Sequence, residues 1–321
     1  MADIALTNGA ERKRRSPFVV FLKRLVKEKP LGTVGGAITV LLLLVGIFAD
    51  VLAPYGMNEP NMDDMLAAPG AKYLLGADNL GRDILSRVIY GARISVIIGL
   101  AASTIATVLS LIIGMMSGFL GKKFDLVVQR IVDTMMSIPQ IILMMILISV
   151  IGAGIWQVTV VLGFMWGIIG SRIIRSAVIG VKEKMYVSAA RSIGCTTPKI
   201  LITHILPNIL APTIVLFTTR VPNVILIEAS LSFLGFGVPP PAPSWGAMLG
   251  GVGRDYMMQA PWIVIWPGLA LALVVYGVNV FGDAVRDIID PRLKGGAGRF
   301  GLKVIVEEEK AQGKSKLKVV K

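Results

Sequence analysis

The chain of 321 residues has few of the side chains on which covalent or metal chemistry depends. It contains one cysteine, Cys195, and one histidine, His204. A single cysteine cannot form a disulfide within the chain, so packing alone must hold the fold. One histidine, without an HExxH-type cluster, supplies neither the nucleophile and base nor the ligand set that a membrane-embedded enzyme needs. We therefore expect no catalytic residue and no metal site.

Charged residues are also scarce. They make up 17% of the chain, against about 25% in soluble domains, whereas hydrophobic residues make up 54% and the mean hydropathy is +0.73. This composition indicates an integral membrane protein. A spanning helix needs about 20 apolar residues, and the apolar runs predict an all-α chain with six transmembrane helices, at residues 31–53, 93–119, 126–151, 155–179, 208–231 and 261–283.

The distribution of Lys and Arg predicts the orientation of these spans. The N-terminal tail carries eight, the loop at 121–130 three, the loop at 172–199 six and the C-terminal tail ten, which is 27 of the 33. Because basic residues are retained on the cytoplasmic side, we expect both termini in the cytoplasm of a multi-pass protein of the inner (cytoplasmic) membrane. The net charge of +13 is then a topology signal, and no nucleic-acid partner is needed to explain it.

The same reading divides the chain into four parts. They are a cytoplasmic tail at 1–30, the first transmembrane helix with an extracytoplasmic segment at 31–92, a core of five transmembrane helices at 93–283, and a cytoplasmic tail at 284–321. The first span has full length and no evident cleavage site, so we expect it to stay uncleaved. Turn residues at 54–90 and prolines at 232–260 predict two structured outer segments. The part after Pro291 is typical of a solvated tail.

One cytoplasmic loop is unlike an ordinary connection between spans. Residues 182–199 predict a basic helix in which Ala189, Ala190 and Gly194 share one face. Small side chains allow another backbone to approach closely, and the basic surroundings suit an acidic partner. An ordinary re-entry loop with incidental alanines is the alternative, and these residues alone do not decide between the two.

The wider loop resembles a known signature, that of the inner-membrane permease subunits of ATP-binding-cassette importers. That signature is Glu-Ala-Ala, three residues, Gly, nine residues, Ile, any residue, Leu and Pro. Its spacing is kept here at Ala189, Ala190, Gly194, Leu206 and Pro207. Two positions depart from it: Ser188 replaces the Glu, and His204 replaces the Ile. By this resemblance, Ser188 lacks the carboxylate that contributes charge and hydrogen bonds at the ATPase contact.

Further motifs extend the resemblance over residues 30–293. They are similar to the C-type subunit of dipeptide and oligopeptide importers. The motifs lie at residues 75–87, 90–93, 231–237, 243–246, 283–287 and 290–292. In the motif at 75–87, only Ala77 differs from the family pattern, which usually has Thr at that position.

The resemblance implies a complete transport system. Its fold would be that of a type I importer, and its partners a second homologous permease, two cytoplasmic ATPase subunits and an extracytoplasmic peptide-binding protein. ATP and magnesium would bind the ATPases, because Gly121-Lys122-Lys123 lacks the earlier Gly and the Ser or Thr of a phosphate-binding loop. The implied cargo is a di- or oligopeptide. Nickel or another small solute is the alternative, and a channel is disfavoured because no filter-like segment is present.

Three sets of candidate site residues follow. By resemblance, the coupling contacts with the ATPase are Ser188, Ala189, Ala190, Arg191, Gly194, Cys195 and Pro198. Polar residues in the fifth span usually face a cavity or a partner, so the candidates for the translocation pathway are Arg220, Asn223 and Glu228; the alternative for Arg220 is a structural contact with an acidic side chain or with the second permease. The candidates for contact with the binding protein are Asp78, Arg82, Asp83 and Trp245, and an internally paired turn is the alternative there.

Overall fold

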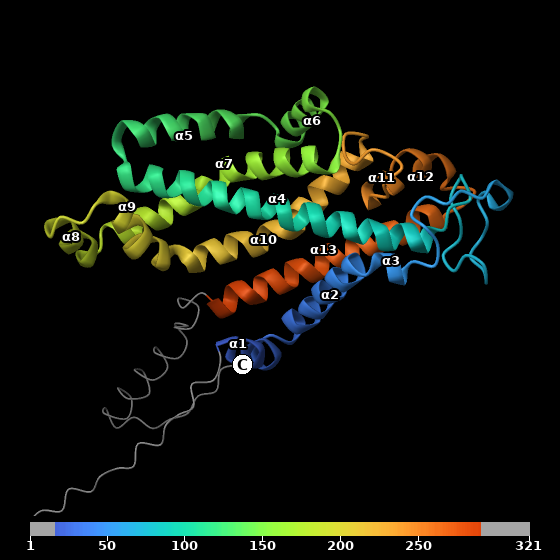
Figure 1. Ribbon diagram of the computed structural model, residues 1–321, viewed down its shortest axis with the longest axis horizontal. Helices are drawn as coiled ribbons and strands as arrows, with labels where there is room; N and C mark the ends of the chain where they lie inside the picture. The colour runs from blue at the N-terminus through green and yellow to red at the C-terminus, as the bar shows by residue number, and fades with distance from the viewer. Residues whose placement is uncertain (1–16, 290–321) are drawn as a thin grey trace, which may run out of the picture.

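The computed structural model describes residues 17–289, which form an elongated helical bundle (Figure 1). One isolated β-bridge, between Ala77 and Asp83, accompanies the helices in this range. The long helices run roughly along one axis, with α8 and α9 at one end and α3, α11 and α12 at the other. The elements are α1 (Pro17–Glu28), α2 (Pro30–Ile47), α3 (Ala49–Leu52), η1 (Met62–Asp64), α4 (Ile84–Leu120), α5 (Lys122–Ser137), α6 (Gln140–Ile151), α7 (Ile155–Lys182), α8 (Met185–Ser192), α9 (Thr197–Ile200), η2 (Leu201–Ile205), α10 (Leu206–Phe233), α11 (Trp245–Leu249), α12 (Gly251–Tyr256) and α13 (Trp262–Ile289).

Five helices of the described part are long and apolar enough to cross a membrane. They are α2, α4, α7, α13 and the continuous stretch Thr197–Phe233 that ends in α10. The predicted span at 126–151 is not one straight helix: α5 and α6 form a pair bent by 95°, and a sixth span results only if this pair is counted as one. Pro139 explains the break, because it forces Ile138 before it into an extended conformation.

The fourth helix begins earlier than the predicted span at 93–119. It starts at Ile84 because Asp83 caps it: the Asp83 carboxylate accepts hydrogen bonds from the backbone N–H of Ser86 at 2.8 Å and from its hydroxyl at 2.7 Å. This cap anchors the start of α4 to the segment that precedes it.

Close packing of α4 against α7 forms the centre of the bundle. Small residues recur every four positions on α4, at Ala102, Ala106, Ser110, Gly114 and Gly118, and α7 presents glycines to them. A Cβ added at Gly163 would lie 2.7 Å from Cβ of Ile105, and one at Gly167 would lie 2.7 Å from Cβ of Leu109. Small residues at this spacing let two membrane helices approach closely without a driving force from water.

Polar contacts hold α5 against α7. The Arg175 guanidinium donates to both carboxylate oxygens of Asp125, at 2.6 and 2.5 Å, and Arg172 pairs with Asp133 further along the same two helices. Val132 is the one buried side chain of α5. Within the described residues, α5 thus meets α7 through ion pairs and buries little apolar surface.

Candidate functional site

The predicted coupling segment is shorter and more broken than a helix over 182–199, so that prediction is wrong in its extent. α7 continues to Lys182, α8 covers Met185–Ser192, and α9 begins only at Thr197. The chain then enters α10 through η2, one turn of π-helix. Figure 1 places α8 at the very end of the bundle, beyond the end of α7.

Gly194 ends α8 and does not contribute to a helix face. Its backbone has φ of +82°, a conformation that glycine adopts without a steric penalty. The N–H of Gly194 donates to the carbonyl of Arg191 at 2.9 Å, and the N–H of Cys195 donates to that of Ala190 at 3.0 Å. These two bonds form a Schellman motif. The spacing from Ala190 to Gly194 is therefore the spacing of a helix cap.

The inner side of α8 packs onto the ends of the spans. Val187 and Ala190 are buried with Ile200 and Ile205, and the Arg191 guanidinium lies 4.8 Å from the ring centroid of Phe119, at the end of α4. The predicted common face of Ala189, Ala190 and Gly194 is therefore wrong, because Ala190 points inward and Gly194 lies beyond the helix.

The side of α8 that faces away from the bundle carries an exposed apolar strip, which the sequence analysis did not predict. Met185, Ala189 and Ile193 follow one another at four-residue spacing; Met185 is 87% exposed and Ile193 is 80% exposed. We call these three residues the α8 strip. The sequence does indicate this strip, since large apolar residues stand four positions before and after Ala189. Of the other predicted contacts, Ser188, Arg191 and Pro198 are exposed and Cys195 is partly buried.

Arg220 is buried inside the chain, in a space that Gly170 leaves open. The residue is 3% exposed, and its Nε and Nη1 have no hydrogen-bond partner among residues 17–289. A Cβ added at Gly170 of α7 would lie 1.4 Å from Nη2 of Arg220 and 2.6 Å from the hydroxyl of Ser110 on α4. The guanidinium thus occupies the junction of α4, α7 and α10, and no described acidic side chain pairs with it.

The other two predicted pathway residues differ sharply from each other. Glu228 is buried, and its Oε1 accepts hydrogen bonds from the hydroxyls of Ser232 at 2.7 Å and Ser244 at 2.8 Å. It fastens α10 to the start of α11 and so does not face an opening. Asn223 is exposed at mid-helix, where its side-chain N–H donates to the carbonyl of Thr219 at 2.7 Å. Of the three, only Asn223 faces out of the bundle.

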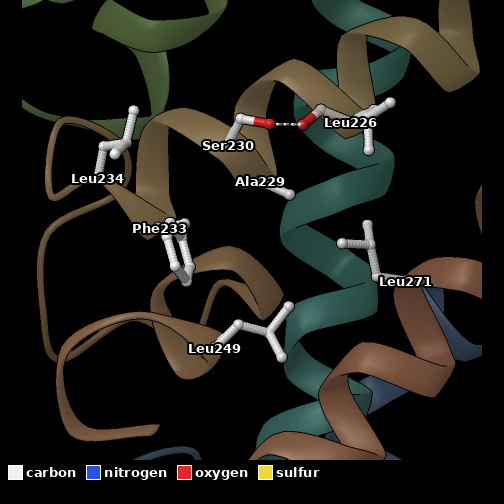
Figure 2. Close-up of a pocket in the computed structure, with 7 residues that line it drawn as sticks. All are labelled: Leu226, Ala229, Ser230, Phe233, Leu234, Leu249 and Leu271. Carbon is white, nitrogen blue, oxygen red and sulfur yellow. Dashed lines mark hydrogen bonds between the residues drawn. The ribbon is translucent and has the colours of Figure 1, made fainter. Parts of the chain in front are cut away.

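A shallow apolar groove lies along the last two turns of α10, beginning at Leu226, three residues after Asn223. Figure 2 shows its lining: Leu226, Ala229, Ser230, Phe233 and Leu234 of α10, with Leu249 of α11 and Leu271 of α13. The groove has a volume of about 330 Å³. Ser230 donates its hydroxyl hydrogen to the carbonyl of Leu226 at 2.8 Å, so the groove presents a mainly apolar surface.

The residues predicted to meet a binding protein make contacts within the chain: Asp78, Arg82 and Asp83 in the segment at 54–90, and Trp245 in the segment at 232–260. Asp78 pairs with Arg82 at 2.7 Å and lies 3.6 Å from Arg87, and Asp83 is the cap of α4 described above. Trp245 is buried and donates to the carbonyl of Val88 at 3.0 Å. This is the geometry of the internally paired turn. Three of the four predicted contacts are buried, and Arg82 is largely covered.

The outer segment carries a second charge pair nearer its surface. Lys72 donates to the carboxylate of Asp64, and this hydrogen bond lowers the pKa of Asp64 and raises that of Lys72. Within residues 17–289 no three His, Cys, Asp or Glu side chains gather as metal ligands would.

Comparison with known proteins gives matches over nearly the whole chain. The family described as "Binding-protein-dependent transport system inner membrane component" matches residues 110–295, and "N-terminal TM domain of oligopeptide transport permease C" matches residues 16–69. The chain is 37% identical over 279 residues to the dipeptide transport system permease protein DppC of Alkalihalophilus pseudofirmus, which covers 87% of this chain and 91% of that protein. It is 36% identical over 289 residues to the di/tripeptide transport system permease protein DppC of Pseudomonas aeruginosa, which covers 88% and 94%.

Proposed function

Because the chain belongs to the inner-membrane components of binding-protein-dependent transport systems, we propose that it is one of two homologous transmembrane subunits of an ATP-driven importer that brings di- or oligopeptides into the cytoplasm. The family resemblance inferred from the motifs is confirmed. The names of the relatives support a peptide cargo. The remaining assignments, namely two ATPase subunits, an extracytoplasmic binding protein and cytoplasmic termini in the inner membrane, rest on the family and on the charge distribution.

The proposal for how this chain is coupled to ATP hydrolysis rests on one observation, the exposed α8 strip. Met185 and Ile193 are large apolar side chains at the tip of a loop, and such a surface marks a contact with another protein. Lys122, Lys123 and Lys184 lie at the same end of the bundle, next to the ends of α4 and α7. We infer that an ATPase subunit receives the α8 strip in an apolar cleft with an acidic rim. Ser188 contributes a hydroxyl where the signature has a carboxylate.

A matched pair of substitutions tests this contact. Met185→Asp should abolish co-purification of the ATPase and binding-protein-stimulated ATP hydrolysis, because a carboxylate in an apolar cleft is strongly disfavoured. Met258→Asp is the control for ATPase co-purification and for basal ATP hydrolysis, since Met258 is 88% exposed at the end of the bundle away from α8. If both variants assemble and hydrolyse ATP like the wild type, the α8 strip is not the coupling contact.

The second permease would face the side of the bundle that carries Asn223. Polar side chains exposed in the middle of a span are costly in lipid, and α13 adds Tyr276 and Asn279 at mid-helix, both exposed. We infer that Asn223, Tyr276 and Asn279 line a path for the cargo between the two permeases. The groove of Figure 2 would meet the partner at the outer end of this path.

Thiol labelling in the assembled transporter tests the path. Cysteines are placed one at a time at Asn223 and at Ile112, an exposed apolar residue of α4, after Cys195 is replaced by Ser. A membrane-impermeant thiol reagent should label Asn223→Cys and leave Ile112→Cys unlabelled, because the first faces water and the second faces lipid. Equal labelling of the two positions would remove the basis for this assignment.

The cargo is tested by reconstitution with the ATPases and the binding protein encoded with this chain. ATP-dependent accumulation of a labelled dipeptide inside vesicles, without accumulation of Ni²⁺, is the expected result. Accumulation of Ni²⁺ alone would establish the alternative cargo and leave the ATPase contact unaffected.

A further inference from the structure

The first helix of the bundle, α1, has an apolar sector wider than its neighbours cover. Leu25 is buried against Ala284 and Ile288 of α13, with Phe21 beside it. Val19, Leu22 and Val26 continue the same sector around the helix, since residues at spacings of three and four share a face. These three side chains are exposed, and Val26 is 60% exposed. We call them the α1 strip.

Basic side chains border the α1 strip. Lys23 and Lys27 follow it on the helix surface, and Arg24 comes next, where it lies 3.5 Å from Glu28. Three basic residues against one acidic residue give this helix a positive surface. An apolar strip with a basic border is the pattern of a helix that lies in the headgroup region of a membrane.

The position of α1 places the α1 strip at the surface of the bilayer. Only Lys29 separates α1 from α2, the first helix long enough to span, and Pro30 begins α2. The Lys29 ammonium lies 2.5 Å from the Asp287 carboxylate, near the end of α13. Figure 1 shows α1 beside the start of α2 and the end of α13. Because α2 crosses the membrane, α1 is held where one leaflet meets water.

We propose that α1 binds anionic phospholipid: the α1 strip inserts among the acyl chains next to the headgroups, while Lys23 and Lys27 contact the lipid phosphates. A basic border is the reason for choosing lipid over a protein partner, since each basic residue near an anionic surface favours binding about fivefold. Lipid-bound α1 then holds the start of α2 and the end of α13 together. The proposal does not depend on the cargo or on the ATPase contact.

A fluorescent probe in the complete transporter tests this proposal. Cys195 is replaced by Ser, Val26→Cys is labelled with a polarity-sensitive dye, and the complex is placed in vesicles of phosphatidylcholine with or without phosphatidylglycerol. Emission should shift to the blue on addition of phosphatidylglycerol. Val20→Cys is the matched control: Val20 is also exposed, but it lies among the basic residues on the opposite side of the helix, so its dye should keep an emission typical of water.

The charge dependence gives the second measurement. Lys23→Gln with Lys27→Gln should lower the bound fraction at limiting phosphatidylglycerol by roughly 25-fold, about fivefold for each charge, while ATP hydrolysis confirms that the complex is assembled. An equal blue shift in pure phosphatidylcholine would refute headgroup recognition. A blue shift that spin-labelled phospholipid in the same vesicles does not quench would show that a protein subunit covers the α1 strip, and would also overturn the proposal.

Discussion

The fit of Arg220 over Gly170 leads to a prediction about how two substitutions combine. In Gly170→Ala, the added methyl group would lie 1.4 Å from Nη2 and 2.7 Å from Cζ of Arg220, so the guanidinium must move. The neighbouring Ser110 hydroxyl, 2.6 Å from the same point, limits where it can go. Overpacking of this kind costs about 1–3 kcal/mol, and we expect Gly170→Ala to be destabilising by that amount.

Removal of the guanidinium should cancel most of this cost. Arg220→Leu alone should be neutral or stabilising, because Nε and Nη1 of Arg220 are buried without a partner among the described residues and an unpaired buried charge is unfavourable. In the double variant the methyl group no longer meets the guanidinium. The coupling free energy between the two substitutions should therefore be about 1–3 kcal/mol in the favourable direction, within the range seen for residues in contact.

Thermal unfolding of the purified complex, followed by its elution from a sizing column after heating, measures these effects. Gly163→Ala serves as the control, because its added methyl group would meet Cβ of Ile105 at 2.7 Å and not Arg220. Its cost should be the same with Arg220 and with Leu at that position. Additive effects of Gly170→Ala and Arg220→Leu would refute the contact and the packing on which it depends.

Four further predictions follow from individual contacts. Gly194→Ala should cost about 1–2 kcal/mol, because alanine resists a φ of +82°, and should lower the ATP hydrolysis that the binding protein stimulates. Asp125→Asn should lower stability by about 1.5–3 kcal/mol, as expected for hydrogen bonds to a charged partner. Asp133→Asn should change stability by only about 0–1 kcal/mol, because the pair of Asp133 with Arg172 is half exposed. Thermal unfolding of the two variants measures the difference. Glu228→Gln should keep transport near the wild-type rate and Glu228→Ala should lower stability by about 1–3 kcal/mol, since only alanine leaves two serine hydroxyls without an acceptor. Arg220→Leu should reduce uptake in vesicles without loss of assembly if the guanidinium gains its acceptor during the transport cycle, and unchanged uptake would exclude that role.

The helices themselves were largely predictable from the sequence because long apolar runs have few alternatives in a membrane. The predicted helix bounds that differ from the structure do so at local backbone signals. Pro139 marks the bend inside the predicted span at 126–151, and Asp83, three residues before Ser86, marks the start of α4. Both signals lie in the sequence, and both concern backbone geometry more than hydropathy.

The ion pairs between helices could not be predicted in the same way. Asp125 and Arg175 are fifty positions apart, and which acidic residue meets which basic residue depends on the rotation of α5 against α7. The same holds for Arg220, whose environment is set by a glycine on another helix. Sequence reasoning identified Arg220 as unusual in a span, but only the packing shows that no acidic side chain among the described residues pairs with it.

The orientation of α8 gives a physical meaning to the sequence pattern in the coupling segment. Val187 and Ala190 pack in one cluster with Phe119 of α4, Val178 of α7 and Ile209 of α10. A small residue at Ala190 lets α8 sit close to these three helix ends, and the cap at Gly194 turns the chain back toward α10. If the ATPase moves α8 through its exposed strip, the displacement reaches α4, α7 and α10 together. These are the three helices that meet at Arg220, so a change in their packing would alter the surroundings of a guanidinium that has no acidic partner among residues 17–289.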